Sequence, residues 1–196
     1  MVGQLKARGF RILGTGEMGI GNTTTSCAVA AALLKKPVST MVGSGAGLSN
    51  EGLSRKRKII EEAIARYDLY EADPMTVLCC VGGFDLAALV GTMIGGAYFG
   101  MPIVLDGVIT EAAALVAVRM LPRVREYLIA SHEGKEPAAR VILAELGLRA
   151  TIYADMALGE GTGAVMSMAQ LDTVLALYRK PLDFADLSID AYQRFS

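Results

Sequence analysis

Short apolar runs that alternate with longer helical stretches are the feature that most constrains the fold of this sequence. Several of these runs end in glycines or an acidic residue, at positions 14–21, 43–47, 82–83 and 106–107. Apolar runs without alternation are typical of parallel strands covered on both faces, with helices as crossovers. The pattern predicts an α/β fold with a mostly parallel sheet flanked by helices, a Rossmann-like three-layer arrangement. Because ligands of such sheets bind at the carboxyl ends of the strands, the four turns should line one crevice.

The same pattern predicts the order of the elements. Strands are expected at 10–14, 39–45, 75–83, 102–107 and 126–131, and a strand or loop at 150–164. Helices are expected at 23–35 (with Asn22 or Thr23 as N-cap), 51–67, 84–99, 110–121, 137–146 and 164–178. Residues 1–180 are expected to form one core domain, with 181–196 as a C-terminal tail.

Charge and cysteine content exclude several classes of protein. The chain has 19 Lys and Arg against 20 Asp and Glu, a formal net charge of -1 that argues against a nucleic-acid partner. Its three cysteines show neither a disulfide framework nor metal spacing, so we expect a reducing, cytoplasmic setting and no metal. Cys79 and Cys80 are expected to be small core residues of a strand.

The chain is unusually apolar, with 53% hydrophobic residues and a mean hydropathy of +0.41. The run 84–105 approaches the length of a membrane span. Asp85 at its start, five glycines from Gly91 to Gly107 and Pro102 within it argue against a transmembrane helix. A buried helix followed by a buried strand is the better interpretation, and no membrane partner is expected. The first ten residues contain no apolar signal segment.

The stretch GTGEMGIGNTTT, residues 14–25, leads from a strand into a helix and suggests an anion site. A helix N-terminus presents unpaired N–H groups, and glycines let the backbone approach an anion closely. The candidate binding residues are Gly19, Ile20, Gly21, Asn22 and Thr23. The stretch lacks the lysine of a P-loop, and its match to G-x-G-x-x-G is weak alone. A tight turn without a ligand is the alternative.

Three further features admit both a functional and a structural interpretation. In GLSRKRK, Lys56 could reach a phosphate held by the first loop, although basic residues on a helix are usually a solvated face. In LGEGTGA, Glu160 could act as a base if apolar walls surround it, or be an exposed acid in a flexible turn. His132, the only histidine, is more simply explained as a hydrogen-bonded structural residue.

Six motifs, taken in order, resemble the family of nicotinate-nucleotide–dimethylbenzimidazole phosphoribosyltransferases. They are GTGEMGIGNTTT, VGSGAGLSNEGLSRK, VGGFDLAALVG, PIVLDGVITEAAAL, YLIASH and LGEGTGA. The resemblance covers the chain from about Phe10 to about Leu177, and its first and last motifs are highly specific as a pair. It implies transfer of the phosphoribosyl group of nicotinate mononucleotide to 5,6-dimethylbenzimidazole. The products are α-ribazole 5′-phosphate and nicotinate, a step in assembling the lower ligand of cobalamin, without cofactor or metal.

The resemblance also implies roles for individual residues. Glu160 matches the general base that deprotonates the benzimidazole, and Glu17 matches a carboxylate beside the ribose that can stabilise positive charge there. Lys56 matches a lysine near the phosphate, and residues 19–23 match backbone that holds it. Further substrate contacts are expected from the other matching motifs, at Gly82, Gly83, Asp106, Gly107, Ser131 and Leu158.

The family's chains are longer and carry an N-terminal region that supplies part of the benzimidazole pocket. The resemblance therefore leads us to expect a homodimer, or a complex with a partner chain carrying that region, which would also cover surplus apolar surface. Two functions stay open at this point. The chain could be an active transferase, alone or as one subunit, or a nucleotide-binding module that no longer catalyses.

Overall fold

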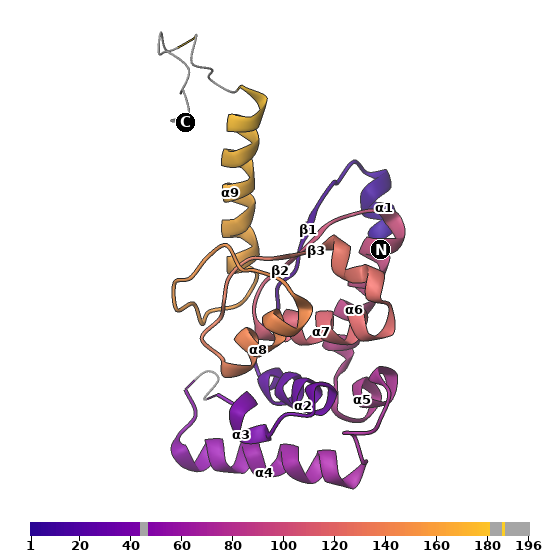
Figure 1. The fold of residues 1–196 in the computed structure, drawn as a ribbon, viewed down its shortest axis with the longest axis vertical. Helices are drawn as coiled ribbons and strands as arrows, with labels where there is room; N and C mark the ends of the chain where they lie inside the picture. Colours follow the sequence, from indigo (N-terminus) through magenta and orange to yellow (C-terminus); the bar gives the residue numbers. More distant parts are fainter. Residues whose placement is uncertain (44–46, 181–185, 187–196) are drawn as a thin grey trace, which may run out of the picture.

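The computed structural model of this chain describes residues 1–43, 47–180 and 186, and it contains a parallel sheet (Figure 1). The strands are β1 (Leu13–Gly14), β2 (Ile103–Leu105) and β3 (Leu128–Ala130), in the order β1-β2-β3. Both pairs are parallel, with Ile103 opposite Leu13 on one side and Leu128 on the other. The strands expected at 10–14, 102–107 and 126–131 are confirmed, though each is shorter than expected.

Helices surround this sheet, and they include the six that the sequence predicts. They are α1 (Val2–Ala7), α2 (Asn22–Leu34), α3 (Val38–Met41), α4 (Asn50–Arg66), α5 (Pro74–Val81), α6 (Phe84–Phe99), α7 (Val108–Met120), the 3-10 helix η1 (Pro122–Tyr127), α8 (Pro137–Leu146) and α9 (Thr162–Arg179). The six expected helices are all present. The segment 150–164 is mainly loop, with one isolated parallel bridge between Ile152 and His132.

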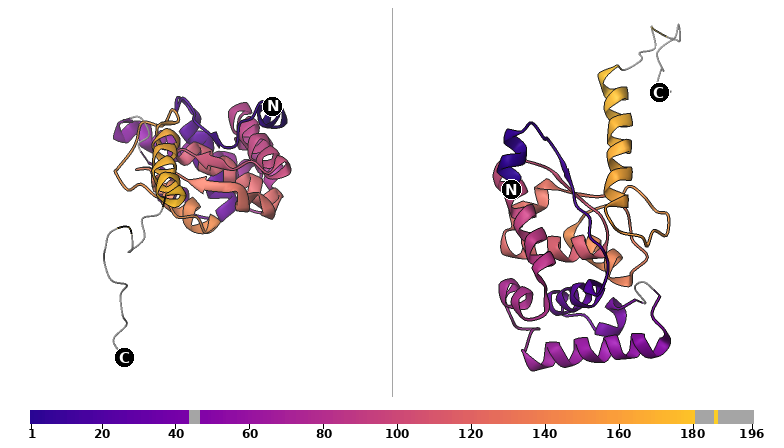
Figure 2. Two further views of the ribbon diagram at one scale, coloured as in Figure 1. Left: turned by 90° about the horizontal axis from the view of Figure 1, so that it is seen from above. Right: turned by 180° about the vertical axis from the view of Figure 1, so that it is seen from behind.

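Helix α7 forms the centre of the core. Its residues from Val108 to Ala117 are all buried, and it packs against α2, α6, α8 and β2. Small alanines on several sides of α7 let these neighbours approach closely. Most of the helices lie on one side of the sheet, while α9 rises from the other (Figures 1 and 2).

The prediction of a strand at 75–83 is wrong, because residues Pro74–Val81 form helix α5. The Asp73 side chain accepts hydrogen bonds from the backbone N–H groups of Met75 and Thr76, and Pro74 occupies the first turn. This cap fixes the helix start and outweighs the β-branched, apolar composition of the run. Cys79 and Cys80 are consequently exposed on a helix, not buried in a strand.

The strand expected at 39–45 is also wrong over its described part. Residues Val38–Met41 form the short helix α3, which begins after Pro37 and ends at Val42 in extended conformation. Residues 44–46, the rest of that expectation, lie outside the described residues. The Pro37 carbonyl oxygen accepts hydrogen bonds from Thr40 N and Thr40 Oγ1, so the apolar run turns instead of extending.

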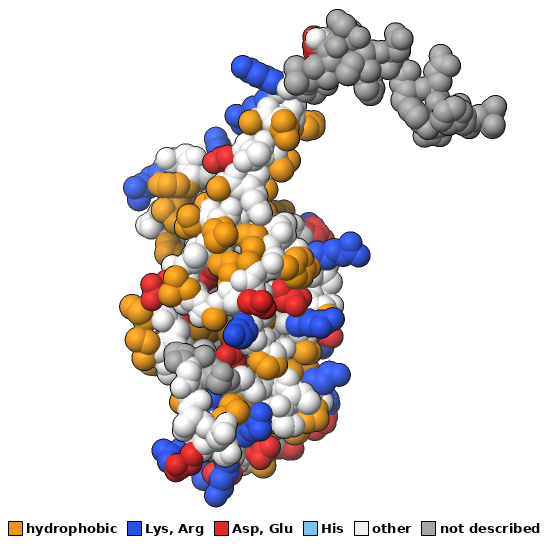
Figure 3. Space-filling view, turned by 90° about the vertical axis from the view of Figure 1, so that its left-hand side faces the viewer, with side chains coloured by type: hydrophobic (Ala, Val, Ile, Leu, Met, Phe, Trp, Pro, Cys, Tyr) orange, Lys and Arg blue, Asp and Glu red, His pale blue; other side chains and the backbone are white. Residues whose placement is uncertain are grey.

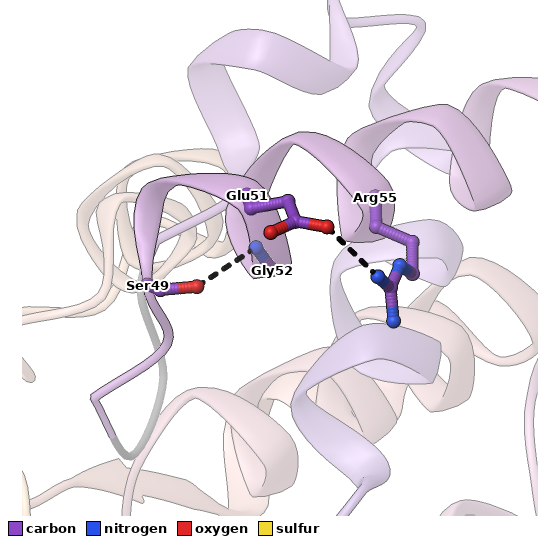
Figure 4. Close-up of polar contacts among 4 residues, drawn as sticks. All are labelled: Ser49, Glu51, Gly52 and Arg55. Carbon is purple, nitrogen blue, oxygen red and sulfur yellow. Dashed lines mark hydrogen bonds and ion pairs between the residues drawn. The ribbon is translucent and has the colours of Figure 1, made fainter.

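Helix α4 shows which basic residue of GLSRKRK faces the protein. Ser49 caps it by accepting a hydrogen bond from Gly52 N, and Glu51 pairs with Arg55 one turn on (Figure 4). Lys56 is buried together with Ile60 and Ile64, at spacings of four residues that place all three on one helix face. Arg55 is exposed, and Lys58 pairs with Glu62 at the surface.

Helix α9 projects beyond the rest of the described molecule (Figures 1 and 2). Only Gly163, Ala164 and Ser167 of this helix are buried. Hydrophobic side chains gather at its base and along its length (Figure 3). Within the described part of the chain, no helix combines the length and the apolar character needed to cross a membrane. The expected tail 181–196 lies outside the described residues apart from Asp186.

Candidate active site

The first loop of the site connects β1 to α2 and places a carboxylate among glycines. Gly19 and Gly21 adopt positive φ values of 78° and 82°, which favour glycine because it lacks a Cβ. Glu17 is half-buried, and its Oε2 accepts a hydrogen bond from Gly19 N at 2.8 Å. The carboxylate is therefore held within its own loop, while the Ile20 side chain between the two glycines is 82% exposed.

The start of helix α2 differs from the expected side-chain cap. Helix α2 begins at Asn22, its N-cap is Gly21, and no side chain caps it. The expectation that Asn22 or Thr23 would be the N-cap is wrong, because the left-handed Gly21 already turns the chain into the helix. The first N–H groups of α2 therefore lack a capping side chain, and such a helix end favours an anion.

Lys56 reaches this helix end from α4. Its ammonium group donates to Thr23 Oγ1 at 3.0 Å and to the Gly43 carbonyl oxygen at 3.4 Å, and the residue is only 4% exposed. Both of these acceptors are neutral, so neither hydrogen bond cancels the ammonium charge. A buried cation therefore lies beside the positive end of a helix dipole.

The turn at Gly82 and Gly83 lies beside the same helix start, although it follows helix α5 and not a strand. Asn22 Nδ2 donates to Asp85 Oδ2 at 2.8 Å, which links the first turns of α2 and α6. The structure thus brings the motif around residues 82–83 to the first loop. The Phe84 side chain is 98% exposed at this position.

The loop that carries Glu160 docks on the loop that carries Glu17, backbone against backbone. Glu160 N donates to the Glu17 carbonyl oxygen at 3.0 Å. A Cβ on Gly16 would meet Gly161 N at 2.6 Å, so only glycine at position 16 permits this approach. The most separated motifs of the sequence, 14–25 and 158–164, therefore meet at one place.

A cavity of about 220 Å³ lies at this junction, lined by Gly14, Thr15, Gly16, Glu160, Gly161, Ala164, Val165 and Met168. The Glu160 side chain is exposed, and so is Leu158, at 67%. The described residues therefore do not enclose Glu160 in apolar walls. Its backbone, however, is anchored at the Glu17 carbonyl oxygen and has a positive φ of 56°.

Asp106, Gly107 and Ser131 meet where β2 and β3 end. Asp106 is 2% exposed and Ser131 is fully buried. Both Asp106 carboxylate oxygens accept hydrogen bonds from the start of α9, from Gly161 N at 2.9 Å and Gly163 N at 2.8 Å. The buried His132 lies 3.0 Å from Ser131 Oγ through Nδ1, in agreement with a structural role. Burial lowers the pKa of His132, and the Asp106 charge opposes this shift.

The sequence interpretation missed two buried residues of α7 beside this group. Thr110 Oγ1 accepts a hydrogen bond from Asp106 N at 2.9 Å and donates to the Gly107 carbonyl oxygen at 2.9 Å. Glu111 is 1% exposed, and neither of its carboxylate oxygens has a hydrogen-bond partner. Burial raises the pKa of Glu111 well above its ordinary value, and the charges of Asp106 and Glu133 add to this. A glutamate inside an apolar helix, ITEAAAL, was the available signal.

Comparison with known proteins places this fold and site in a class described as phosphoribosyltransferases. The family described as Phosphoribosyltransferase matches residues 1–189. More particularly, the chain belongs to the nicotinate-nucleotide–dimethylbenzimidazole phosphoribosyltransferase family. It is 42% identical to the protein of that name from Ruminiclostridium cellulolyticum over 193 residues, and 44% identical to the one from Acetivibrio thermocellus over 193 residues.

Each of these alignments covers 98% of this chain and 55% of the relative, so the chain spans about half the length of the curated relatives it matches. The solved structure of CobT from Thermus thermophilus superposes with a TM-score of 0.88 at 40% identity, and the match covers 96% of this chain and 56% of that one. These comparisons confirm the fold class and the family expected from the sequence.

Proposed function

We propose that this chain carries the catalytic core that transfers the phosphoribosyl group of nicotinate mononucleotide to 5,6-dimethylbenzimidazole. The products would be α-ribazole 5′-phosphate and nicotinate, for assembly of the cobalamin lower ligand. Family membership supports this reaction class, because the relatives bear this activity in their names. The observation that carries the proposal is the docking of the Glu160 loop on the Glu17 loop, beside the uncapped start of α2.

The phosphate of the mononucleotide would bind at the start of α2. The N–H groups of Asn22 and Thr23 and the buried Lys56 ammonium offer donors and positive charge there. Thr23 Oγ1, held by Lys56, can turn its own hydroxyl proton toward the anion. Phosphate bound far from the reacting carbon fixes the sugar, and this remote binding energy lowers the barrier to reaction.

The two carboxylates would then act on opposite partners. The benzimidazole nitrogen attacks C1′ with inversion as the bond from C1′ to the nicotinate ring nitrogen breaks, and that bond's electron pair stays with nicotinate. Positive charge develops at the sugar, and Glu17 would stabilise it. The second benzimidazole nitrogen gives up its proton to Glu160, which would act as general base. The exposed Leu158 would offer apolar contact to the flat base.

The exposed position of Glu160 supports an active site that a second chain covers. A base works best near neutral pH when its surroundings are apolar, and this chain's described residues leave Glu160 open. We therefore include in the proposal a homodimer, or a partner chain, that covers the site from outside, in the cytoplasmic setting expected from the cysteine content. The open site also favours the alternative, a nucleotide-binding module that cannot catalyse alone.

The reaction is tested by incubating the purified chain with nicotinate mononucleotide and 5,6-dimethylbenzimidazole and detecting α-ribazole 5′-phosphate by mass spectrometry. We expect product from the wild-type chain, a loss of at least about 100-fold in Glu160→Gln, and no change in the exposed Glu126→Gln control. Absence of product together with measurable mononucleotide binding would favour the module. Absence of both product and mononucleotide binding would contradict the proposed active site.

The anion site has its own test, in calorimetric titration with nicotinate mononucleotide. Lys56→Met should weaken binding by at least about 10-fold, since a charge-assisted contact is lost at a buried position. Lys58→Met is the matched control, because Lys58 lies two residues away on the same helix and pairs with Glu62 at the surface. Equal binding by both variants would place the phosphate elsewhere.

A further inference from the structure

Asp106 caps a helix whose N-cap residue lies 55 residues further along the chain. The N-cap of α9 is Gly161, which has no side chain to satisfy the first N–H groups of the helix. Asp106 Oδ2 accepts from Gly161 N at 2.9 Å and Oδ1 from Gly163 N at 2.8 Å. Both oxygens of this buried carboxylate are thus engaged with the backbone that follows Glu160.

The backbone of Asp106 is itself held in place by buried polar groups. Asp106 N donates to Thr110 Oγ1 at 2.9 Å, and Ser131 Oγ donates to the Asp106 carbonyl oxygen at 3.1 Å. Thr110 and Ser131 are 1% and 0% exposed. Asp106 therefore sits on a rigid strand end, which is the kind of support that a precisely held side chain needs.

The segment that Asp106 holds has an unusual backbone. Gly159, Glu160 and Gly161 have φ values of 75°, 56° and 82°, three left-handed residues in succession. This conformation is strained for glutamate, so it persists only when its surroundings fix it. Two hydrogen bonds do so: Glu160 N to the Glu17 carbonyl oxygen on one side, and Gly161 N to Asp106 on the other.

We propose that Asp106 is a positioning residue for Glu160, acting through the backbone of residues 159–163 and not through contact with substrate. This inference rests on the proposed function for its catalytic half. Its structural half, that Asp106 holds the loop in its left-handed form, stands without it. Glu111 is buried beside Asp106 without a hydrogen-bond partner, and burial raises its pKa well above the ordinary value.

The structural half is tested by amide hydrogen exchange in Asp106→Asn. Asparagine keeps one carbonyl oxygen but turns an amide donor toward the other N–H, so one cap bond is replaced by a donor facing a donor. Exchange in residues 158–165 should rise at least about 10-fold. The control is Asp155→Asn, an exposed acid on the same loop with φ of 48°, where exchange should not change. Unchanged protection in Asp106→Asn would overturn the proposal.

The catalytic half is tested by steady-state kinetics of the same variants. Asp106→Asn should lower kcat by about 10- to 100-fold, since a small misplacement of a catalytic group has that effect, and leave KM for nicotinate mononucleotide unchanged. Because Asp106 would act only through Glu160, the double variant with Glu160→Gln should be no slower than Glu160→Gln alone. A raised KM with unchanged kcat, or additive losses, would instead make Asp106 a substrate-contacting residue.

The two tests separate this proposal from the proposed function. If the wild-type chain forms no product, the proposed activity fails for the chain alone, and the exchange experiment still decides whether Asp106 holds the loop. If the wild type is active and Asp106→Asn loosens the loop without lowering kcat, the reaction stands and the positioning role is wrong.

Discussion

Helices α7 and α9 both start beside Asp106, yet the two lie in opposite surroundings. Helix α7 follows Asp106 in the chain, and the start of α9 is hydrogen-bonded to it. In α7 every residue from Val108 to Ala117 is buried. In α9 only Gly163, Ala164 and Ser167 are buried, and Val174, Leu177 and Tyr178 are 61%, 69% and 83% exposed. The same strand end thus anchors the most buried helix of the described molecule and the most exposed one.

The difference shows how the site divides its tasks. Helix α7 forms the rigid support of the site, because its close packing against α2, α6 and α8 fixes the end of β2. Helix α9 is held chiefly at its first turn, where the Glu160 loop enters it. The rest of α9 carries several exposed apolar side chains, and such a surface is typical of an interface.

Removal of a core side chain from α7 should produce the largest effect. Leu115 is 1% exposed, and Leu115→Ala should lower the free energy of unfolding by about 2–5 kcal/mol, from lost burial and the cavity that remains. Leu175→Ala is the control on α9, where the side chain is 44% exposed and the loss should be below about 0.5 kcal/mol. Chemical denaturation of both variants measures the two losses in the free energy of unfolding. Equal losses would contradict the difference in burial between α7 and α9.

The first turn of α9 should respond like the core. A Cβ on Gly163 would meet His132 Nδ1 at 2.1 Å and Ser131 Oγ at 2.7 Å, both on buried residues. Gly163→Ala should therefore cost about 1–3 kcal/mol of unfolding free energy. Gly91→Ala in α6 is the control, because nothing lies within 4 Å of the added Cβ, and it should stabilise by about 0.5–1 kcal/mol. A neutral Gly163→Ala would mean that α9 does not dock as described.

Glu111 on α7 should make stability depend on pH. Burial raises its folded-state pKa, so below the unfolded value of about 4.3 both states are protonated and the group has no effect on stability. As pH rises further, the unfolded state releases the proton and the folded state keeps it, so the free energy of unfolding falls, until the folded-state pKa is reached. The slope cannot exceed about 1.4 kcal/mol per pH unit for one proton.

Denaturation of Glu111→Gln at about pH 5 and about pH 8 checks this. Between the lower and the higher pH, the free energy of unfolding of the variant should rise relative to that of the wild type by on the order of 1 kcal/mol. The reason is that the variant lacks the ionisation that favours unfolding. Asp172→Asn, at an exposed position of α9, should show no such gain. If the wild type and Glu111→Gln have equal free energies of unfolding at both pH values, Glu111 ionises freely in the folded protein.

Much of the fold could be predicted from the sequence, because helix lengths and glycine turns are local signals. Residues 75–83 could not be assigned from apolar periodicity alone, since a short buried run fits a strand or a helix equally well. The decisive signal was Asp73 before Pro74, a cap that was overlooked. The exposure of α9 against the burial of α7 was not predictable, because both are apolar helices and only tertiary packing separates them.

The site was predictable as a set of motifs but not as geometry. The meeting of residues 16–17 with 160–161 depends on backbone hydrogen bonds between loops far apart in sequence. The burial of Lys56 had a local signal, its spacing of four from Ile60 and eight from Ile64. The hydrogen bonds from Gly161 N and Gly163 N to Asp106 had no local signal in the sequence. A carboxylate that caps a distant helix looks like any other acid in a turn.

The smallest effect is expected at the far end of α9. Val174→Gln combined with Leu177→Gln should change the free energy of unfolding by less than about 0.5 kcal/mol, since both side chains are already exposed. Binding of an apolar dye such as ANS should fall, because the apolar strip of α9 is interrupted. Asp172→Asn on the same helix should leave dye binding unchanged. If the double variant instead loses more than about 1 kcal/mol and its apparent mass falls by half, α9 already packs against a second copy. The contrast with α7 would then be between a core within one chain and a core shared by two.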